Sequence, residues 1–598
     1  MIFGKTLNKY YIKYAALFIL GIFALIMVDL AQLEIPLITK ELVNTLEDRL
    51  LNNSQDGAFL NDIVVTIIWI TVAIVLGRFL WRFGIVGASR RIDYDLRNEM
   101  FGHCTKLSNN YYSEKKVGGL MAHFTNDLEA VRRSIGPGLI MFVDATFLGI
   151  LTFYRMFQLE VRMTLVLVLP LFVVATLGMY LGNKMRMRFR QSQEAFERLS
   201  DFTNESFSGI SVIKAFVKEK TEIKEFLKAN KNAKQKNIRF VRIATILQVI
   251  VQFTVSAGFI MILGYGGYLV DSTRDLAEAN QFTLGDLAAF ISYFGMLIWP
   301  MMALSRIIHV RSQGKASLER IDSILYQEID VKDDGNIVHI DEIKGDIEFK
   351  HLDFQYPDGD ENALEDITFS IKAGQTVGIL GRTGSGKTTI VDLLLRIYNV
   401  NTGQLYIDGI DIMQLPIKKV RENIGYVPQD GFLFSDTIKN NISLGVEEDA
   451  SDIDRIEYMA KLSDVHENII DFKHGYDTVI GERGVTLSGG QKQRVSIARA
   501  LAKEPPILIM DDSVSAVDTC TEEKILGNLK KIREGKTTIM IAHRITTVKN
   551  ADKIVVIDDG KRTVGFLPIG GVGGFPPAAW GGEEDGFTVK LNGRGVER

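Results

Sequence analysis

The sequence predicts an all-α transmembrane domain of six helices followed by a soluble α/β domain. Three observations support this prediction: six long apolar segments before residue 305, ordinary soluble composition over 340–560, and a glycine-rich loop between an apolar strand and a helix. A chain of 598 residues is also too long for one core. The expected boundaries are 1–325 for the transmembrane domain, 326–343 for a linker, 344–561 for the α/β domain and 562–598 for a tail.

Composition excludes few functions. The chain is 46% hydrophobic and 24% charged, with a net charge of -4, so it lacks the basic excess that would favour nucleic-acid binding. Cys104 and Cys520 are far apart and match no metal-ligand spacing. They indicate either a reducing compartment or no special role.

Six segments are long and apolar enough to cross a bilayer, which takes about 20 helical residues. The expected spans are 14–35, 62–83, 137–158, 163–183, 244–269 and 284–305. We do not interpret the first apolar segment as a signal peptide, because no small-residue cleavage site follows it and the apolar run is too long.

Lysine and arginine gather near one set of span ends: Lys5, Lys9, Lys13, Arg90, Arg91, Lys184, Arg186, Arg188 and Arg190. Because such residues favour the cytoplasmic side, we expect a multi-pass protein of the cell membrane with a cytoplasmic N-terminus. Six crossings return the chain to the same side, which places residues 306–598 in the cytoplasm.

The inner connections, 84–136 and 184–243, are long and have helical apolar spacing. We expect the membrane helices to continue into the cytosol, with turns near Gly118–Gly119 and Ser208–Gly209. The alternative is a pair of independent soluble inserts.

Four ionisable residues, Asp29, Arg78, Asp144 and Arg155, fall inside the expected spans. Such groups are costly in lipid, so they should face protein or a water-filled cavity. Asp29 and Asp144 therefore have two interpretations: contact with a cationic substrate, or a hydrogen bond between helices.

The segment "TVGILGRTGSGKTTIVDLLL" has the order strand, G-x-x-x-x-G-K-[ST], helix. Its glycines let main-chain N–H groups surround phosphate oxygens, its lysine reaches the β- and γ-phosphates, and its threonine hydroxyl can bind Mg²⁺. The helix adds its positive N-terminal end. The expected ATP-binding residues here are Gly381, Arg382, Thr383, Gly384, Ser385, Gly386, Lys387, Thr388 and Thr389.

A second apolar strand, "PPILIMDD", ends in two carboxylates. Asp511, the first, is the expected Mg²⁺ ligand together with Thr388. A strand merely capped by acids is a weak alternative once the phosphate-binding loop is present.

Between these elements lies "LSGGQKQRVSIARAL", residues 487–501. With the other motifs, it gives a chain that resembles the ATP-binding-cassette (ABC) transporters up to about Lys561. The resemblance implies roles for further residues. Tyr356 in "FQYP" would stack on adenine, and Gln429 in "YVPQD" would sense Mg²⁺ and the membrane domain.

The same resemblance assigns residues to a site shared between two cassettes. Ser488, Gly489 and Gly490 would close over the γ-phosphate of ATP held by the opposite subunit. "SAVD", ending in Asp518, would link the two sites, and His543 in "IAHR" would contact the γ-phosphate.

Six spans and one cassette resemble the half-transporter layout of ABC exporters, which implies a second ABC half as partner. The implied substrates are hydrophobic or cationic small molecules. Alternatives on the same fold are a lipid flippase, a peptide exporter and an importer-like variant. From another class come a membrane receptor or channel that senses ATP, and the cassette machines of DNA repair or translation, which the six spans disfavour.

Position 512 departs from the family's usual glutamate, the base that polarises the attacking water. Asp512 has similar acidity but a shorter reach. Because a misplacement of about 1 Å can cost roughly 10²-fold in rate, we expect slow hydrolysis at this site. The pattern resembles the degenerate-site member of heterodimeric bacterial multidrug exporters.

After "KIVVIDDGK" the family pattern is lost. Residues 562–598 are dense in glycine and match no family motif, so we expect a disordered tail.

Overall fold

The computed structural model describes residues 4–52, 58–115, 117–274, 281–333, 335–446, 452–481, 487–564, 590–592 and 595–597. The chain divides into two compact units. The helical unit comprises Met1–Cys104 and Gly118–Tyr326, and the α/β unit comprises Thr105–Val117 and Gln327–Arg598. The segment Thr105–Val117, expected in the first domain, therefore groups with the second.

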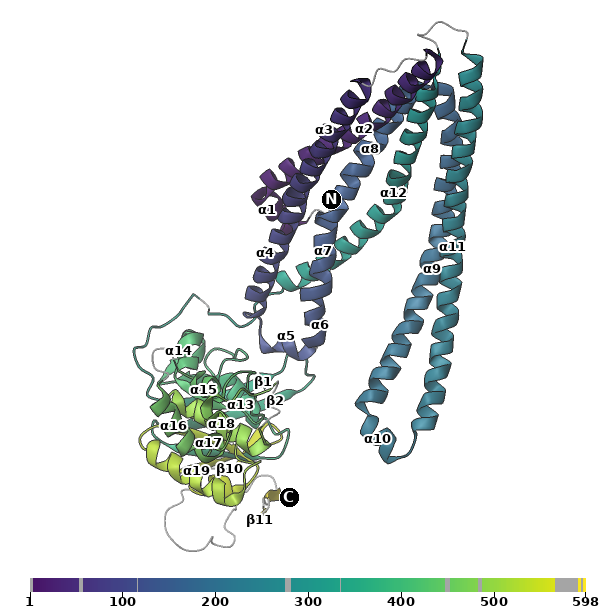
Figure 1. Ribbon diagram of the computed structural model, residues 1–598. Coiled ribbons are helices and arrows are strands. Elements are labelled where there is room, and N and C mark those ends of the chain that lie inside the picture. The colour runs from purple at the N-terminus through teal and green to yellow at the C-terminus, as the bar shows by residue number, and fades with distance from the viewer. Residues whose placement is uncertain are drawn as a thin grey trace. The chain divides into compact units, whose positions relative to one another are not determined.

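Helices of very different lengths, several of them long, make up the helical unit (Figure 1). Their bounds are α1 (Lys5–Lys13), α2 (Ala15–Asn52), α3 (Ala58–Trp81), α4 (Gly87–Cys104), α6 (Val117–Ala122), α7 (Leu128–Ile135), α8 (Pro137–Leu159), α9 (Val161–Ser208), α10 (Ile210–Ala215), α11 (Glu219–Ser272) and α12 (Leu284–Leu325). Two π-helical turns, Arg82–Val86 and His123–Asp127, join α3 to α4 and α6 to α7.

Among the described residues, five helical stretches are long and apolar enough to cross a membrane: 15–50, 61–104, 118–159, 219–272 and 284–325. They cover five of the six expected spans to within one residue. The remaining span, 163–183, lies inside the continuous helix α9, which is not one of the five.

The packed interior of this unit lies where α2, α8, α11 and α12 meet. Phe290, Tyr293 and Phe294 of α12 are buried there, and the Tyr293 hydroxyl donates to the main-chain oxygen of Leu33 at 2.9 Å. α12 begins at a capping box in which Thr283 and Asp286 each bond the other's main-chain N–H. The Tyr293–Leu33 hydrogen bond joins α12 to α2, and α8 packs against both of these helices, an arrangement used below.

Helices α9 and α11, of 48 and 54 residues, pack side by side along their length (Figure 1). α9 ends at Ser208 with Gly209 as its C-cap, which confirms the turn expected at Ser208–Gly209. The other expected turn is wrong. Gly118 and Gly119 lie in α6, and the chain reverses earlier, through 105–115 with the short helix α5 (Asn109–Glu114).

The α/β unit contains two main sheets. Their strands are β1 (Ile347–Gln355), β2 (Asn362–Ile371), β3 (Thr376–Gly381), β4 (Leu405–Ile407), β5 (Ile410–Asp411), β6 (Ile424–Val427), β7 (Ile507–Asp511), β8 (Thr537–Ala542), β9 (Lys553–Asp558) and β10 (Lys561–Val564). The first sheet is antiparallel with order β2-β1-β4-β5. The second has order β10-β9-β3-β8-β7-β6, parallel except for β10.

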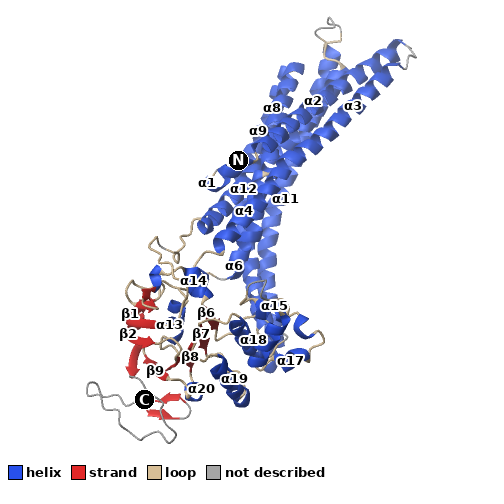
Figure 2. Cartoon of the chain, turned by 90° about the vertical axis from the view of Figure 1, so that its left-hand side faces the viewer, coloured by secondary structure: helices blue, strands red, loops and turns tan. Residues whose placement is uncertain are grey.

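The helices of this unit are α5, α13 (Lys387–Leu394), α14 (Ile417–Glu422), α15 (Ile438–Ser443), α16 (Ile453–Leu462), α17 (His466–Ile470), α18 (Gly489–Ala502), α19 (Thr519–Ile532) and α20 (Ile545–Val548). Figure 2 shows the strands gathered in one part of the unit and α15, α17 and α18 in another.

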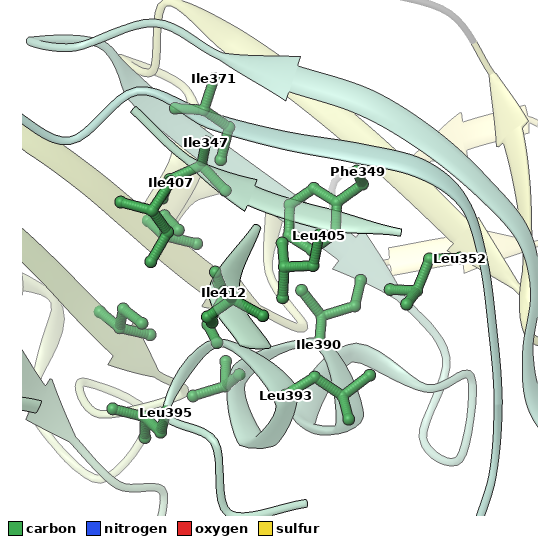
Figure 3. Close-up of a cluster of buried hydrophobic side chains, with 14 of the residues drawn as sticks. Ile347, Phe349, Leu352, Ile371, Ile390, Leu393, Leu395, Leu405, Ile407 and Ile412 are labelled. Carbon is green, nitrogen blue, oxygen red and sulfur yellow. The ribbon is translucent and has the colours of Figure 1, made fainter. Parts of the chain in front are cut away.

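Two of the three hydrophobic cores in the described part of this unit follow this division. One packs α13 between the two sheets, and its labelled side chains in Figure 3 are Ile347, Phe349, Leu352, Ile371, Ile390, Leu393, Leu395, Leu405, Ile407 and Ile412. The other joins α15, α16 and α18 to β6 and β7, with Val495 and Ile497 of α18 fully buried. The phosphate-binding helix α13 and helix α18 are therefore anchored in different cores.

The cassette ends in regular structure. β10 pairs antiparallel with β9 and extends to Val564, beyond the expected boundary at 561. Near the C-terminus, β11 (Lys590–Asn592) and β12 (Gly595–Glu597) form a two-stranded ladder. Residues 565–589, on which the expectation of disorder chiefly rested, lie outside the described residues.

Candidate nucleotide-binding site

Four neighbouring parallel strands end at the same edge of the larger sheet. In the order β3-β8-β7-β6 they are followed by the glycine-rich loop, His543, Asp512 and Gln429. The register places Leu380 opposite Ala542 and Asp511 opposite Ile541, so the strand ends are level. In open α/β sheets this carboxyl edge is where ligands bind. Residues predicted from separate motifs thus meet along one edge.

The loop between β3 and α13 has the backbone geometry of a phosphate cradle. Gly384 and Gly386 have φ values of +84° and +93°, which disfavour any side chain. A Cβ on Gly386 would also lie 2.6 Å from Leu364 Cδ2 and 2.7 Å from the main-chain oxygen of Ala363. Arg382 and Thr383 are exposed, while Ser385 and Thr389 are buried.

Lys387 is the first residue of α13 and is buried. Its Nζ donates to the main-chain oxygens of Gly381 at 2.9 Å and Arg382 at 2.6 Å. Burial lowers the pKa of the Lys387 ammonium, and the nearby carboxylates Asp511 and Asp512 oppose that shift. The ammonium thus lies within the loop, where it is close enough to serve a bound phosphate.

Thr388 and Asp511 connect the loop to the acidic strand. The Thr388 hydroxyl donates to Asp511 Oδ2 at 3.0 Å. Burial raises the pKa of the Asp511 carboxyl, and Asp512 adds to this. The Thr388 hydrogen bond and the nearby Lys387 and His543 act in the opposite direction. An oxygen pair of this kind, with negative charge at the sheet edge, suits a hard divalent cation.

Asp512 follows β7 at a sharp turn of the main chain. Its φ is +44°, an uncommon value for a residue with a side chain, and its N–H donates to the main-chain oxygen of Ile541 at 3.0 Å. Ser515 Oγ donates back to the Asp512 main-chain oxygen at 2.8 Å. Asp512 is half-buried, so its carboxyl is held by a constrained backbone at the level of Asp511.

Tyr356 lies beside the start of α13. Its hydroxyl is 2.8 Å from Thr389 Oγ1, and its half-buried ring meets the rings of Phe354 and Tyr398 edge-on. Tyr398 was not singled out from the sequence, because only the tertiary fold brings it to this position. The aromatic group therefore borders the loop that would hold phosphate.

Ser488, Gly489 and Gly490, expected to close over ATP held by the opposite subunit, are called the signature from here on. They lie at the first turn of α18. Ser488 is its N-cap, and a capping box links Ser488 with Gln491, whose N–H lies 3.3 Å from Ser488 Oγ. Gly489 and Gly490 follow at the positive end of the helix. The end of α18 thus presents main-chain N–H groups suited to an anion, in a different core from Lys387.

Gln493 is a site residue that sequence reasoning missed. Its Oε1 accepts from the N–H of Ala516 at 3.1 Å, and its Nε2 lies 3.5 Å from both the Gln429 main-chain oxygen and Ser515 Oγ. It is buried, on a helix face lined mostly by apolar residues. A glutamine on that face was the available signal.

The exposed Gln429 side chain lies on the loop after β6. That strand pairs with β7, with Val427 opposite Met510, so Gln429 follows a strand end adjacent to that of Asp511. Asp518 has a structural contact: it caps α19 by accepting from the N–H of Thr521 at 3.0 Å.

The residues present fit MgATP. The positive-φ glycines leave room for phosphate oxygens, Lys387 supplies a cation, and the Thr388–Asp511 pair supplies oxygen ligands. Among the described residues no group of three or more His, Cys, Asp or Glu side chains forms a metal cage. That agrees with Mg²⁺ being held by one or two protein ligands together with phosphate and water.

The fold and the site define a membrane-embedded ATPase with a phosphate-binding loop. The family description "ABC transporter transmembrane region" matches residues 18–301, and "ABC transporter" matches residues 364–515. The chain is 40% identical over 532 residues to the "Probable multidrug resistance ABC transporter ATP-binding/permease protein YheI" of Bacillus subtilis (strain 168), covering 87% of this chain and 89% of that protein.

A second relative is the "Multidrug resistance-like ATP-binding protein MdlA" of Escherichia coli (strain K12), 36% identical over 498 residues, with 83% and 82% coverage. Among solved structures, a bacterial Atm1-family ABC exporter with ATP bound superposes with a TM-score of 0.71 at 24% identity. The superposition covers 93% of this chain and 95% of that chain.

This protein belongs to the ABC transporters. It has the exporter-type fold, a helical transmembrane domain followed by a cassette, and is an ATPase coupled to transmembrane transport.

Proposed function

We propose that this chain is one half of a heterodimeric exporter that expels hydrophobic or amphipathic compounds across the cytoplasmic membrane. In this proposal its own ATP site hydrolyses slowly, while its signature completes the fast site of its partner. The names of the relatives support the substrate class, since YheI is described as "probable multidrug resistance" and MdlA as "multidrug resistance-like".

The need for a partner chain is supported by the two cores of the cassette. The phosphate-binding loop precedes α13 in the core between the sheets, whereas Ser488–Gly490 begin α18 in the other core. Each motif offers main-chain N–H groups to an anion. A second chain would bring its signature to this loop and receive this chain's signature in return.

The hypothesis of slow hydrolysis at this chain's own ATP site rests on Asp512. Its backbone is held at φ +44° by hydrogen bonds at both ends of the residue, so the main chain is poorly placed to move forward and compensate for a short side chain. Aspartate is one methylene shorter than glutamate, and a general base must come within about 2.6–3.2 Å of its proton or act through a water. This site would therefore bind ATP normally and hydrolyse it slowly.

The remaining site residues take the following roles in the proposal. Tyr356 stacks on adenine, and the loop from Gly381 to Thr389 binds the phosphates, with Lys387 on the β- and γ-phosphates. Thr388, Asp511 and Gln429 hold Mg²⁺, which neutralises phosphate charge when bound. His543 contacts the γ-phosphate.

We assign the N-terminus and the cassette to the cytoplasm because lysine and arginine gather at that end of the helices. The structure adds detail to this end: Lys9 pairs with Glu99, and Lys13 pairs with Asp95 at 2.6 Å. These pairs hold α1 against α4, at positions beyond the expected spans 14–35 and 62–83.

Alternatives with the same fold are a lipid flippase and a peptide exporter. An ATP-sensing membrane regulator is an alternative from another class, and a slow ATP site would suit it. ATP turnover that rises when amphipathic drugs are added to the paired complex favours export, whereas drug-independent nucleotide binding with negligible turnover favours sensing.

The proposal is tested by coexpressing the chain with an ABC half that has glutamate after its acidic strand. Asp512→Asn should lower ATP turnover of the complex less than about twofold, since this site contributes little. Glutamine in place of the partner's glutamate should lower it about 10²-fold or more. The isolated chain, as a homodimer, should be nearly inactive.

Equal, severe losses from the two substitutions would show that Asp512 is a working base. A homodimer as active as the mixed complex would overturn the heterodimer. Asp512→Glu serves as the matched control: it should raise turnover at this site if the partner's signature is competent.

A further inference from the structure

An acidic side chain in the helical unit is buried beside a second acid. Asp29 of α2 is fully buried, and neither of its carboxyl oxygens has a hydrogen-bond partner among the described residues. Its neighbour is another acid, Asp144 of α8. Two adjacent carboxyl groups in an apolar helical unit are costly unless they share a proton or a positive charge joins them.

The same two helices also contain an acid that is paired with a cation. Glu34 of α2 accepts from Arg155 of α8 at 3.1 Å, so that contact is electrically neutral. The Asp29–Asp144 pair has no such cation within the described chain. If helix packing were its whole role, asparagine would provide donors as well as acceptors at lower cost.

A third helix supplies an aromatic group. Trp299 of α12 donates its Nε1–H to Asp144 Oδ2 at 2.6 Å, and 44% of the Trp299 residue is exposed. Asp144 is half-buried, so part of this carboxyl group remains accessible beside Trp299. Indole faces attract cations, most strongly where water is excluded.

Apolar surface continues from this point. Phe147 and Met302 lie three residues beyond Asp144 and Trp299, on the same helix faces, and both are exposed. A compound with an apolar body and a positive group would contact these side chains with its body and the acids with its charge. A hard metal ion is a poorer occupant, because it needs six or more oxygen ligands and only two carboxyl groups are present.

We propose that Asp29, Asp144 and Trp299 form a binding site for the positive group of an amphipathic organic cation. Asp144 and the indole contact the cation, and Asp29, buried behind them, supplies a second carboxyl group whose proton the bound cation displaces. The inference rests on the proposed export function, which it deepens by naming a charge class of substrate.

The test measures binding without ATP, so it is separate from transport. The full chain in lipid nanodiscs, as purified with its partner, is dialysed to equilibrium against methyltriphenylphosphonium or triphenylphosphine oxide. These two compounds have nearly the same size, but only the first is charged. Empty nanodiscs correct for partition into lipid.

Asp144→Asn is the main variant, because asparagine keeps an acceptor for Trp299 Nε1 and removes only the charge. It should weaken phosphonium binding about tenfold or more and leave oxide binding within about twofold. Asp29→Asn should do the same, while Asp29→Glu should retain part of the phosphonium affinity. Asp48→Asn, farther along α2, is the matched control and should change neither.

Three results would overturn the site: wild-type protein that binds neither compound, variants that lose both equally, or variants that lose neither. Failure of the export function looks different. In that case the wild-type complex would bind methyltriphenylphosphonium through the acids yet move neither compound across the membrane when ATP is supplied.

Discussion

Thr388 and Asp511, 123 residues apart, meet through a hydrogen bond of 3.0 Å from the threonine hydroxyl to the carboxylate. One comes from the start of α13 and the other from the end of β7. Because β8 lies between β3 and β7, this contact spans the sheet edge and sets the distance between the phosphate-binding loop and the acids.

Removing the carboxylate from this pair should affect the metal-dependent part of ATP binding. Asp511→Asn should lower ATP affinity about 10- to 100-fold in Mg²⁺ and much less in excess EDTA, because only the metal complex uses the carboxylate. Thr388→Ser keeps the hydroxyl and should behave nearly as wild type. Equal losses with and without Mg²⁺ would show that Asp511 supports the fold rather than the metal.

The ionisation of Asp392, a half-buried residue of α13, should contribute to the pH dependence of stability. Burial, followed by the charge of Asp511, raises the pKa of the Asp392 carboxyl from 3.8 to about 6. Between those values the folded state binds more protons than the unfolded state, so the free energy of unfolding falls as pH rises. The penalty is complete above pH 6 and absent below 3.8.

Asp392→Asn should therefore raise the free energy of unfolding at pH 7.5, by about 1–2 kcal/mol once partial exposure is allowed for, and change it less at pH 4.5. Calorimetry of the full chain at both pH values measures this difference. Asp360→Asn, at an exposed position, is the control. A benefit that is equal at the two pH values would point to packing instead of charge.

Alanine substitutions at two glycines of the phosphate-binding loop distinguish the cost of backbone strain from the cost of a steric clash. Gly384→Ala meets open space at φ +84°, so it should cost about 1 kcal/mol of stability. Gly386→Ala adds a collision with Leu364 and Ala363, which should raise the loss to about 2–4 kcal/mol and impair ATP binding. Denaturant unfolding and ATP titration compare the two. Similar losses would mean that the loop relaxes freely around Gly386.

Gln493 should link the signature helix to the loop before α19. Gln493→Ala removes the acceptor for the Ala516 N–H, a contact worth about 1 kcal/mol. ATP turnover in the paired complex should fall, while ATP affinity at this chain's own phosphate loop should hold. Gln493→Glu keeps an acceptor and should retain more turnover. Loss of ATP affinity instead would place Gln493 in support of the Gln429 loop.

How far the sequence predicted this structure depended on how local each signal was. The phosphate loop, the acidic strand and the signature are contiguous motifs flanked by apolar runs, so their elements were predicted correctly. Likewise, Gly209 follows a helix that ends at Ser208, as expected of a glycine C-cap. The turn expected at Gly118 and Gly119 was misplaced, because glycine also fits a helix start and the chain reverses through 105–115 instead.

Features set by tertiary packing could not be read in advance. The positive φ of Asp512 depends on hydrogen bonds to Ile541 and Ser515. The contact of Tyr356 with Tyr398 depends on how β1 meets the segment after α13. The meeting of Asp29 with Asp144 depends on the register between α2 and α8, which no local pattern specifies.

The lengths of α9 and α11 have a mechanical consequence. At 1.5 Å per residue these helices extend about 70–80 Å, of which a bilayer core covers only about 30 Å. The paired helices therefore act as a lever with an arm of about 40 Å beyond the membrane. A rotation of about 5° at the membrane would swing α10 sideways by about 3–4 Å, roughly the rise of two helical residues. A small rotation at the membrane end would thus displace α10 by several ångströms. Conversely, a displacement of several ångströms at α10 would rotate the membrane helices by only a few degrees.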